Sequence, residues 1–428
     1  MLFHETYKRC IRYLINVYDG IIRMYKKRIM MFVVLTAFIF CQITTVSAAE
    51  ISDNELHAKA ACLMDGDSGR VLYQKQADEP MPMASTTKIM TGIIALESGD
   101  TSSVVTASKE AAKAPQVHLG VQEGQTFLLG DLLYGLLLES FNDTAVMIAE
   151  SVGESVEGFT NMMNAKAKEI GCRDTHFVSP NGLDASDEGG IHHTTAQDLA
   201  LIMRYCISIS PKKDEFIKIT QTPSYSFWDH DNQVFYNCNN HNAFLNMMDG
   251  ALSGKTGFTA KAGYCYIGAL ERDGKLLIVS LLACGWPNNK TYKWADTKKL
   301  MTYGLENYEY RDIYKDGILA EPITVTDGQY EGRLGGGESH VMPVYKDGRE
   351  VEERRQMLLS PDENVEVKVN LPRKLKAPVK AKTKVGDVSY HLNGNKIIEY
   401  PVYLEKTVRR IDLAWCMGHV FSIFLDQE

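Results

Sequence analysis

The position of the strand-like segments limits the fold of this chain more than any other feature. Residues 58–76, AKAACLMDGDSGRVLYQKQ, place two short apolar runs around a turn-rich DGDSG, a pattern typical of a β-hairpin. Residues 253–285 also read as strands, with Arg272-Asp273-Gly274 as the turn between two of them. Helical segments lie between these distant strands. We therefore expect an α/β (α+β) domain, an antiparallel sheet flanked by helices and closed by segments far apart in the sequence.

Helical signals occupy the middle of this domain. Ser85 begins an apolar-periodic helix that runs to about Glu97 and stops before Gly99. Residues 128–152, LLGDLLYGLLLESFNDTAVMIAESV, predict two helices with a break around residues 140–143.

The composition changes after about Tyr310. Short alternating runs such as ENVEVKVNL and VGDVSYHLNGNKIIEYPVYL replace the helical signals, and the second run folds over Asn393-Gly394. We expect a first domain over residues 50–312 and a small all-β C-terminal domain over residues 318–407.

Two segments of the C-terminal part are candidates for surface contacts. The tail, residues 409–428, is apolar from Ile411 to Leu425 with three polar interruptions. A helix of that length rises about 22 Å, short of the roughly 30 Å hydrocarbon core of a membrane. We expect an amphipathic anchor that lies in the membrane interface, with a helix packed on the β domain as the alternative. The stretch from Lys368 to Lys384 has seven basic residues and no acid, which suits either a solvated strand face or contact with an anionic membrane or wall polymer.

The first 49 residues have the pattern of an export signal. A basic run at residues 26–28 precedes an apolar run and the small residues VSAAE, which fits a signal peptide over residues 1–49 with Met24 as a possible true start. A membrane-spanning helix is the weaker alternative because the apolar run is too short. The protein is therefore expected to be exported and to act outside the cytoplasm.

Charge and cysteine content exclude several classes of protein. The leader holds seven of the 46 Lys and Arg and two of the 54 Asp and Glu, so the formal net charge without it is −13. Such an acidic chain is not expected to bind nucleic acid. Seven of the nine cysteines follow the leader, singly and without a C-x-x-C, and are expected to be mostly buried free thiols.

Three short motifs carry the chemistry. In MASTTKIMTG, Ser85 and Lys88 are three residues apart and share one face of a helix. A serine hydroxyl becomes a nucleophile when a base takes its proton, and a lysine can do so if burial or nearby positive charge lowers its pKa. Ser140-x-Asn142 follows at the helix break, and then Lys255-Thr256-Gly257 in SGKTGFT opens a strand whose edge could bind an extended peptide.

This ordered trio is typical of penicillin-binding proteins and class A β-lactamases. With the segments MPMASTTKIMT, SFNDTAVMIAE, FVSPNGLD, TTAQDLALI and GKTGFTAKAGYC, the chain resembles the low-molecular-mass penicillin-binding proteins, serine D-alanyl-D-alanine carboxypeptidases of the peptidase S11 family. The resemblance implies removal of the terminal D-Ala from peptidoglycan pentapeptide stems through an acyl-enzyme. It also implies β-lactam antibiotics as covalent inhibitors, a penicillin-binding catalytic domain over residues 50–312, and no metal or organic cofactor.

The resemblance also implies roles for the residues of the first two motifs. Ser85 is the expected acyl-enzyme nucleophile and Lys88 its general base. Ser140 is expected to relay a proton to the leaving amine, and Asn142 to bind the substrate amide or to orient Lys88.

Further roles fall on the third motif. Lys255 is expected to supply positive charge, and Thr256 and Thr259 to hold the terminal carboxylate of the substrate. The backbone N–H groups of Ser85 and Phe258 are expected to form the oxyanion hole. Gly257 is expected to let the substrate approach the strand closely.

The sequence departs from the family pattern at two positions. Phe141 stands where many relatives have Gly and is expected to narrow or reshape the cleft. Where relatives often carry an arginine for the carboxylate, the best-placed residue is Lys293, which lacks the bidentate fork of arginine. The alternative for Lys293 is a solvated helix lysine.

Two further segments are expected to be structural. His192-His193 lacks the i, i+4 spacing of a zinc-binding helix, so we expect no metal there. SPNGLD, residues 179–184, is expected to be a turn in the wall of the cleft.

Three other functions stay open. A β-lactamase shares the serine, lysine and KTG elements, but no E-x-x-L-N loop lies between Ser140 and Lys255. A D,D-endopeptidase would use the same residues on cross-linked peptides, and a catalytically inactive wall-binding scaffold would keep the fold alone.

Overall fold

The computed structural model describes residues 51–425 apart from 232, 316, 332–336 and 346–355, together with residues 20, 22 and 24–26. The expected signal peptide over residues 1–49 therefore lies almost entirely outside the described residues, and the N-terminal Cys10 and Cys41 lie outside them as well.

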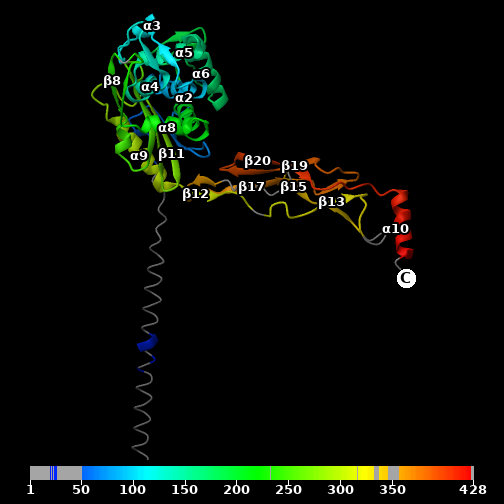
Figure 1. Cartoon of the computed structure of the whole chain (residues 1–428). Coiled ribbons are helices and arrows are strands. Elements are labelled where there is room, and N and C mark those ends of the chain that lie inside the picture. Colours follow the sequence, from blue (N-terminus) through cyan, green and yellow to red (C-terminus); the bar gives the residue numbers. More distant parts are fainter. Residues whose placement is uncertain are drawn as a thin grey trace, which may run out of the picture. The chain divides into compact units, whose positions relative to one another are not determined.

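A five-stranded antiparallel sheet forms the centre of the first domain (Figure 1). Its order is β2 (Val71–Lys75), β1 (Ala60–Asp65), β11 (Lys275–Leu282), β10 (Gly263–Arg272) and β9 (Ala251–Thr259). The predicted closure by distant segments is confirmed, because β1 pairs with β11, from Ala60 opposite Leu282 to Asp65 opposite Leu277.

The sheet is covered on both faces, which explains why its central strands carry apolar residues on both sides. Alternate residues of β1 enter two different hydrophobic clusters. Cys62 and Met64 pack with α7 (Ala196–Arg204), whereas Ala61 and Leu63 pack with α9 (Tyr292–Asn307). A sheet buried in this way gives long uninterrupted apolar runs.

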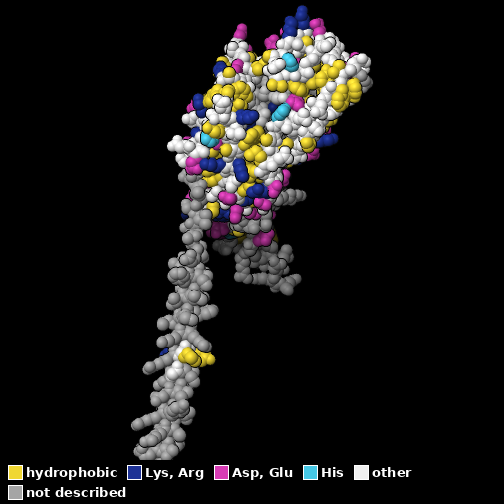
Figure 2. Space-filling view, turned by 90° about the vertical axis from the view of Figure 1, so that its left-hand side faces the viewer, with side chains coloured by type: hydrophobic (Ala, Val, Ile, Leu, Met, Phe, Trp, Pro, Cys, Tyr) yellow, Lys and Arg dark blue, Asp and Glu magenta, His cyan; other side chains and the backbone are white. Residues whose placement is uncertain are grey.

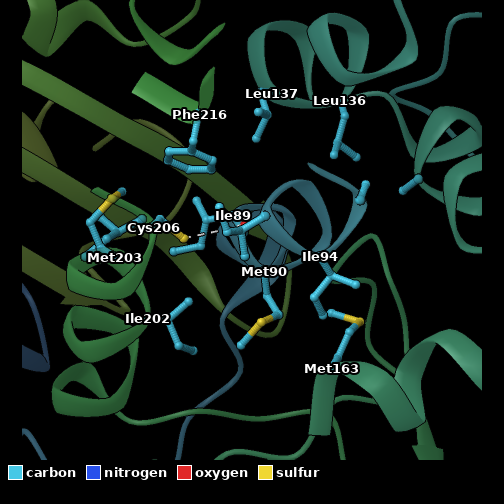
Figure 3. Packing of buried hydrophobic residues seen from close by; sticks show 14 of the residues in the cluster. Ile89, Met90, Ile94, Leu136, Leu137, Met163, Ile202, Met203, Cys206 and Phe216 are labelled. Atoms are coloured by element: carbon cyan, nitrogen blue, oxygen red, sulfur yellow. Dashed lines mark hydrogen bonds between the residues drawn. The ribbon is translucent and has the colours of Figure 1, made fainter. Parts of the chain in front are cut away.

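The helix predicted from Ser85 is almost completely buried in the first domain. The chain enters it through a 3₁₀ turn, η2 (Ala84–Thr87), and continues as α2 (Lys88–Ser98) with Gly99 as its C-cap. Figure 3 shows Ile89, Met90 and Ile94 of α2 surrounded by side chains of several other helices. This packing fixes the start of α2, where the predicted nucleophile and base lie.

The predicted break between two helices is confirmed near residue 140. Helix α4 (Leu129–Tyr134) runs into a π-helical segment, η3 (Gly135–Glu139), and α5 (Asn142–Gly153) begins two residues after Ser140. The remaining elements of this domain are short helices, helix α6 and paired strands: η1 (Asp53–Glu55), β3 (Val104–Thr106), α3 (Lys109–Ala112), β4 (Thr126–Leu128), α6 (Val156–Ile170), β5 (Ser186–Asp187), β6 (Gly190–Ile191), η4 (Tyr205–Ile209), α8 (Lys213–Gln221), β7 (Ser224–Trp228), β8 (Phe235–Asn239) and η5 (Ala243–Asn246).

The part of the chain after α9 is built from strands until its terminal helix, as predicted for a small all-β domain. Its larger sheet has the order β15-β20-β19-β17, and β19 and β20 turn over Asn393-Gly394, both at positive φ. The strands are β12 (Glu309–Asp312), β13 (Ile323–Thr326), β14 (Ser339–Val341), β15 (Pro343–Tyr345), β16 (Gln356–Leu359), β17 (Val365–Asn370), β18 (Lys374–Lys376), β19 (Lys384–Leu392) and β20 (Asn395–Leu404). All seven basic residues between Lys368 and Lys384 are exposed.

The C-terminal tail forms one helix, α10 (Leu413–Leu425). Among the described residues, no helix combines the length and the apolar content needed to cross a membrane. Trp415 and His419 of α10 stack on each other and contact Tyr330, while Leu413 and Phe421 are well exposed.

The cysteines after the leader are free thiols, as predicted. Five of the seven are buried, and Cys172 and Cys416 are partly buried. Burial raises the pKa of the Cys62 thiol to about 12, which keeps it protonated and unreactive at neutral pH.

Candidate active site

The Ser85-x-x-Lys88 motif spans the junction between η2 and α2. The Nζ atom of Lys88 lies 2.9 Å from the Oγ atom of Ser85, although the lysine side chain is completely buried. Ser85 is partly exposed and lines a cavity of about 530 Å³. The hydroxyl can therefore meet a ligand while its neighbouring amine is shielded from water.

The Lys88 amine has two further oxygen partners. It lies 2.9 Å from Oδ1 of Asn142 and 2.6 Å from the backbone carbonyl oxygen of Asn181. Burial, reinforced by the nearby charge of Lys255, holds the pKa of the Lys88 amine well below its ordinary value, and Asp143 only partly opposes this. The amine is thus arranged to be neutral.

A neutral amine at this position has the geometry of a general base. Its two N–H bonds point to oxygens that can only accept, those of Asn142 and Asn181. The lone pair is then left for the third neighbour, the hydroxyl of Ser85, which becomes the donor in that pair. Proton transfer from Ser85 to Lys88 needs no movement of either residue.

Ser140 and Asn142 lie at the junction between η3 and α5. Ser140 has left-handed backbone dihedrals, with φ 71° and ψ 31°, a conformation that is rare for residues other than glycine. Its buried Oγ atom has no hydrogen-bond partner among the described residues. Asn142 is held by a hydrogen bond from Nδ2 to the carbonyl oxygen of Pro115 and from its backbone N–H to that of Val117.

Asp143 fixes the loop on which Pro115 and Val117 lie. Its carboxylate accepts hydrogen bonds from the backbone N–H groups of residues 119–121 at 2.8 to 3.3 Å. Asn142 therefore meets Lys88 at the end of a helix whose next residue is tied to the same loop.

Strand β9 brings the third motif to the cavity. It is an edge strand of the five-stranded sheet, as the prediction of peptide binding along it requires. Lys255 is buried, and its Nζ atom donates to the carbonyl oxygen of Thr256 at 3.0 Å. Burial lowers the pKa of Lys255 to about 7, with Glu139 opposing the shift.

Gly257 allows two backbone segments to approach each other closely. A Cβ atom at this position would lie 2.9 Å from the backbone nitrogen of Ser85. It would also lie 3.0 Å from the carbonyl oxygen of Met83 and 3.0 Å from the backbone nitrogen of Thr86. The glycine thus lets β9 pack directly on the turn that carries Ser85, which brings the backbone of the third motif beside the predicted nucleophile.

Every site residue predicted from the sequence except Lys88 lines the 530 Å³ cavity, and Lys88 lies behind Ser85. Phe258 is exposed, and its ring lies 4.7 Å from that of Tyr264. The hydroxyl of Thr259 accepts from the backbone N–H of Ala262, which leaves its own proton free to be donated.

Phe141, in contrast, packs into the hydrophobic core beside α5 and does not line the cavity. The expectation that it narrows the cleft is therefore not met.

Lys293 is placed differently from a solvated helix lysine. It is only 7% exposed, and its Nζ atom lies 4.7 Å from the ring centre of Tyr264 and 4.8 Å from that of Trp294. The amine donates to the carbonyl oxygen of Lys290 at 2.6 Å. Burial lowers its pKa.

The sequence did not identify the importance of Asn181. SPNGLD does form part of the cleft wall, but the carbonyl of Asn181 also accepts from Lys88 and lies 3.4 Å from the Oγ atom of Ser85. Gly182 has φ +85°, and a Cβ atom there would clash with the carbonyl oxygen of Ala84. The N-G pair was the available signal, because it marks a tight turn pressed against another backbone.

His192 supports the same region from inside. Nδ1 accepts from the backbone N–H of Val178, so Nε2 carries the proton and donates to Oγ1 of Thr87 at 2.9 Å. Burial lowers the pKa of His192 to about 3. The residue is a neutral link between the turn that contains Asn181 and η2, a structural role.

Glu139 and His241 form a hydrogen-bonded pair at the rim of the cavity. Their side chains are 2.6 Å apart, and the second carboxylate oxygen of Glu139 accepts from the backbone N–H of Asn239. This pair joins the end of β8 to the residue before Ser140. A second, larger cavity of about 920 Å³ lies between α3, α5 and the start of α6, and Pro115 and Asn181 are among the residues that line it.

Two family models match the chain. The model described as D-alanyl-D-alanine carboxypeptidase, peptidase S11, matches residues 44–284, more than half of the chain. The model described as penicillin-binding protein 5, C-terminal domain, matches residues 360–410. The two matches fall on the sheet-and-helix domain and on the all-β part.

Individual proteins are similar over most of the length. D-alanyl-D-alanine carboxypeptidase DacC of Escherichia coli K12 is 30% identical over 397 residues, which cover 87% of this chain and 90% of that protein. The crystal structure of D-alanyl-D-alanine carboxypeptidase DacD from Francisella tularensis has a TM-score of 0.64 at 24% identity, covers 86% of this chain and 96% of that one, and supports the fold alone. Penicillin-binding protein D2 from Listeria monocytogenes in its ampicillin-bound form has a TM-score of 0.50 at 30% identity, over 59% of this chain and 98% of that one.

Proposed function

Because this chain belongs to the D-alanyl-D-alanine carboxypeptidase family, peptidase S11, we propose that Ser85 attacks the bond before the terminal D-Ala of peptidoglycan pentapeptide stems. The protein is a serine-type hydrolase of the penicillin-binding fold. The observation that carries the assignment of residues is the position of the buried Lys88 amine, 2.9 Å from the hydroxyl of Ser85.

In the acylation step, Lys88 takes the proton of Ser85 while Oγ attacks the carbonyl carbon of the penultimate D-Ala. The backbone N–H groups of Ser85 and Phe258 stabilise the negative charge on the carbonyl oxygen. Gly257 supports this arrangement, since it brings β9 within contact of the nitrogen of Ser85.

The leaving D-Ala then needs a proton on its nitrogen. Ser140 is the proposed relay because it lines the cavity and its buried hydroxyl has no hydrogen-bond partner among the described residues. Its proton is therefore free to turn toward the leaving amine, and Lys88 can resupply it. Water completes the cycle by hydrolysing the acyl-enzyme.

The terminal carboxylate of the substrate is proposed to bind at the other end of the cavity. Thr256 and Thr259 offer hydroxyl groups there, and Lys255 and Lys293 offer positive charge. A lysine acts as a point charge on a carboxylate, without the paired hydrogen bonds of an arginine.

A β-lactam presents a strained amide to the same serine and is proposed to acylate it. Slow hydrolysis of this acyl-enzyme is expected, so the purified protein should turn over nitrocefin slowly. Rapid nitrocefin hydrolysis would instead favour a β-lactamase.

The test of the function is release of free D-Ala from a soluble peptide that ends in D-Ala-D-Ala. Ser85→Ala should abolish release and labelling by fluorescent penicillin, while Ser102→Ala, at an exposed serine, should retain both. Cleavage of cross-linked muropeptides in preference to pentapeptide monomers would identify an endopeptidase. Absence of labelling at Ser85 in the folded protein would identify an inactive scaffold.

The proposed place of action is outside the cytoplasm, at the outer face of the membrane. Leu413, Met417, Val420 and Phe421 recur on one face of α10 and are between 41% and 78% exposed. A helix with one exposed apolar face and too short to span suits peripheral insertion into the membrane interface. Arg409 and Arg410 precede it and favour anionic headgroups.

Cosedimentation with anionic lipid vesicles tests this attachment. The exported chain should sediment with the vesicles, and a chain shortened after Thr407 should not. Equal sedimentation of both would show that α10 is not the anchor.

A further inference from the structure

The β7–β8 hairpin presents two different faces. Its inner residues, Phe227 and Cys238, are buried in the core of the first domain. Tyr225 is half-buried, and its ring stacks on that of Tyr134 at 3.6 Å. The hairpin is therefore a rigid part of the domain, and its outer face is held in a fixed orientation.

The outer face begins with a pair of exposed aromatic side chains. Trp228 and Phe235 are opposite each other in the strand register, 49% and 55% exposed, with ring centres 5.2 Å apart. Beyond them, the carboxylate of Asp229 accepts hydrogen bonds from the backbone N–H groups of Gln233 and Val234. Two large aromatic rings that contact each other and are about half exposed to water are a candidate binding surface.

The rest of the outer face is polar and uncharged. The next opposed pairs are Ser226 with Asn237 and Ser224 with Asn239, all exposed. Ser226 donates to Oδ1 of Asn237 at 2.8 Å, which leaves the amide NH₂ group of Asn237 to face a ligand.

This combination of side chains selects a chemical class. Pyranose sugars have apolar C–H faces that stack on aromatic rings, and hydroxyl groups that pair with amide and hydroxyl side chains. An anionic membrane surface would call for lysine or arginine, whereas the charged residues at this turn are Asp229 and Asp231. Figure 2 views the protein from the side on which β8 lies in Figure 1, and hydrophobic side chains form several separate patches there. Such small patches suit a polar ligand better than a large apolar partner.

The outer face leads to the active-site cavity. From Phe235 to Asn239 the strand rises about 14 Å. The backbone N–H of Asn239 then donates to Glu139, which lines the cavity with His241. Four extended residues of a stem peptide span at most about 14 Å from Ser85, so a stem that leaves the cavity along this rim directs its sugars toward the hairpin, and the glycan strand can continue along the outer face to Phe235.

We propose that the outer face of the β7–β8 hairpin, with Trp228 and Phe235 as its stacking platform, binds the glycan strand that carries the stem peptide. This inference rests on the proposed function for the identity of the substrate. The enzyme then holds its polymeric substrate at two places, the peptide terminus at Ser85 and the sugars on the hairpin.

The direct test is binding of glycan strands from which all stem peptides have been removed. The chain has four tryptophans, and the fluorescence of the wild-type protein should change saturably as such strands are added. Trp228→Ala combined with Phe235→Ala should abolish this binding, measured by cosedimentation with insoluble strands. Trp228→Phe should retain cosedimentation. Ile191→Ala, at an equally exposed apolar residue, is the matched control.

The kinetic test separates this inference from the proposed function. The double variant should lose roughly tenfold in kcat/KM on polymeric peptidoglycan and nothing on a short soluble peptide. Unchanged glycan binding in the double variant, or no glycan binding by the wild type, overturns the inference while penicillin labelling of Ser85 still supports the function. Two other results would assign the surface to another occupant and overturn the inference as well. One is dimerisation in solution that the double variant abolishes, and the other is binding to lipid vesicles through Trp228 and Phe235.

Discussion

The Nζ atom of Lys88 lies 2.9 Å from the Oγ atom of Ser85 and has no contact with bulk water. The two other oxygens around this amine belong to Asn142 and Asn181 and can only accept hydrogen bonds from it. The base is thus oriented toward its serine by two groups from different parts of the chain, one from the start of α5 and one from a turn.

Lys88→Arg should greatly slow acylation, because it replaces the neutral amine with a permanently charged guanidinium. A guanidinium stays protonated at any usable pH and cannot take the proton of Ser85. The rate of labelling by fluorescent penicillin should fall by at least about 10²-fold, the usual contribution of a general base. Lys261→Arg, at an exposed lysine, should label normally.

Lys88→Gln separates loss of the base from disruption of the fold. The neutral amide of the glutamine can remain buried between Asn142 and Asn181. The thermal midpoint of Lys88→Gln should therefore differ less from the wild-type value than the midpoint of Lys88→Arg does. Rapid labelling of either variant would exclude Lys88 as the base.

The pH dependence of the free enzyme should show the titration of Lys255. Its pKa is about 7, so its positive charge is present below that pH and is lost as the pH rises through it. Since this charge is proposed to attract the substrate carboxylate, kcat/KM for a D-Ala-D-Ala peptide should fall above about pH 7. Lys255→Arg keeps its charge, and its residual activity should show no such fall. A wild-type profile that stays flat from pH 6 to pH 9 would contradict this role.

The sequence predicted the parts of the site that have a side-chain signature. Ser85, Lys88, Asn142 and Lys255 come together as their motifs indicated, because helix and strand periodicity fix which way each side chain points. The hairpin turns at Asp273-Gly274 and Asn393-Gly394 were also predicted, since both need residues that tolerate positive φ.

The sequence could not predict contacts made by backbone atoms or by distant pairs. Every residue has a backbone carbonyl, so the sequence does not distinguish the carbonyl of Asn181 from any other. Only the folded chain shows that this carbonyl accepts a hydrogen bond from Lys88. Glu139 and His241 are likewise ordinary residues until β8 ends beside η3. Phe141 was judged by its size, but the turn of the backbone after Ser140 directs its ring into the core.

Gly257→Ala should impair acylation more than it impairs folding. The added methyl group would meet backbone atoms of the turn that carries Ser85 at about 3 Å, and backbone cannot rotate away as a flexible side chain can. Strand β9 would move outward and take the N–H of Phe258 with it, so the rate of penicillin labelling should fall by about 10²-fold. In Gly418→Ala the methyl group meets open space, and labelling should be unchanged. Normal labelling of Gly257→Ala would show that β9 tolerates the shift.

His192→Gln should change how stability depends on pH. The pKa of His192 is about 3 in the folded chain and about 6.5 in an unfolded one, so below pH 6.5 only the unfolded state takes up a proton. The stability that this residue contributes is complete above pH 6.5 and is lost as the pH falls, by about 2 kcal/mol between pH 7.5 and pH 5. Glutamine does not titrate, and the corresponding loss in the variant should be smaller by that amount. Denaturant unfolding at both pH values measures the difference, with the exposed His118→Gln as the control. Equal losses in His192→Gln and the wild type would mean that His192 is not buried as a neutral group.

Lys293→Met should affect binding of the substrate carboxylate and leave the chemical step intact. The lysine amine is held between the rings of Tyr264 and Trp294 at one end of the cavity, and methionine keeps a similar length without the charge. The Michaelis constant for a peptide with a free D-Ala-D-Ala terminus should rise roughly tenfold, the loss of one partly buried charged contact. The value of kcat and the penicillin labelling of Ser85 should change little, because Lys293 is proposed to contact the substrate carboxylate and not the reacting groups. A peptide whose terminus is amidated has no carboxylate to lose, so its weak binding should be the same in variant and wild type. An equal loss on both peptides would assign Lys293 to the packing of α9 instead of to recognition of the substrate.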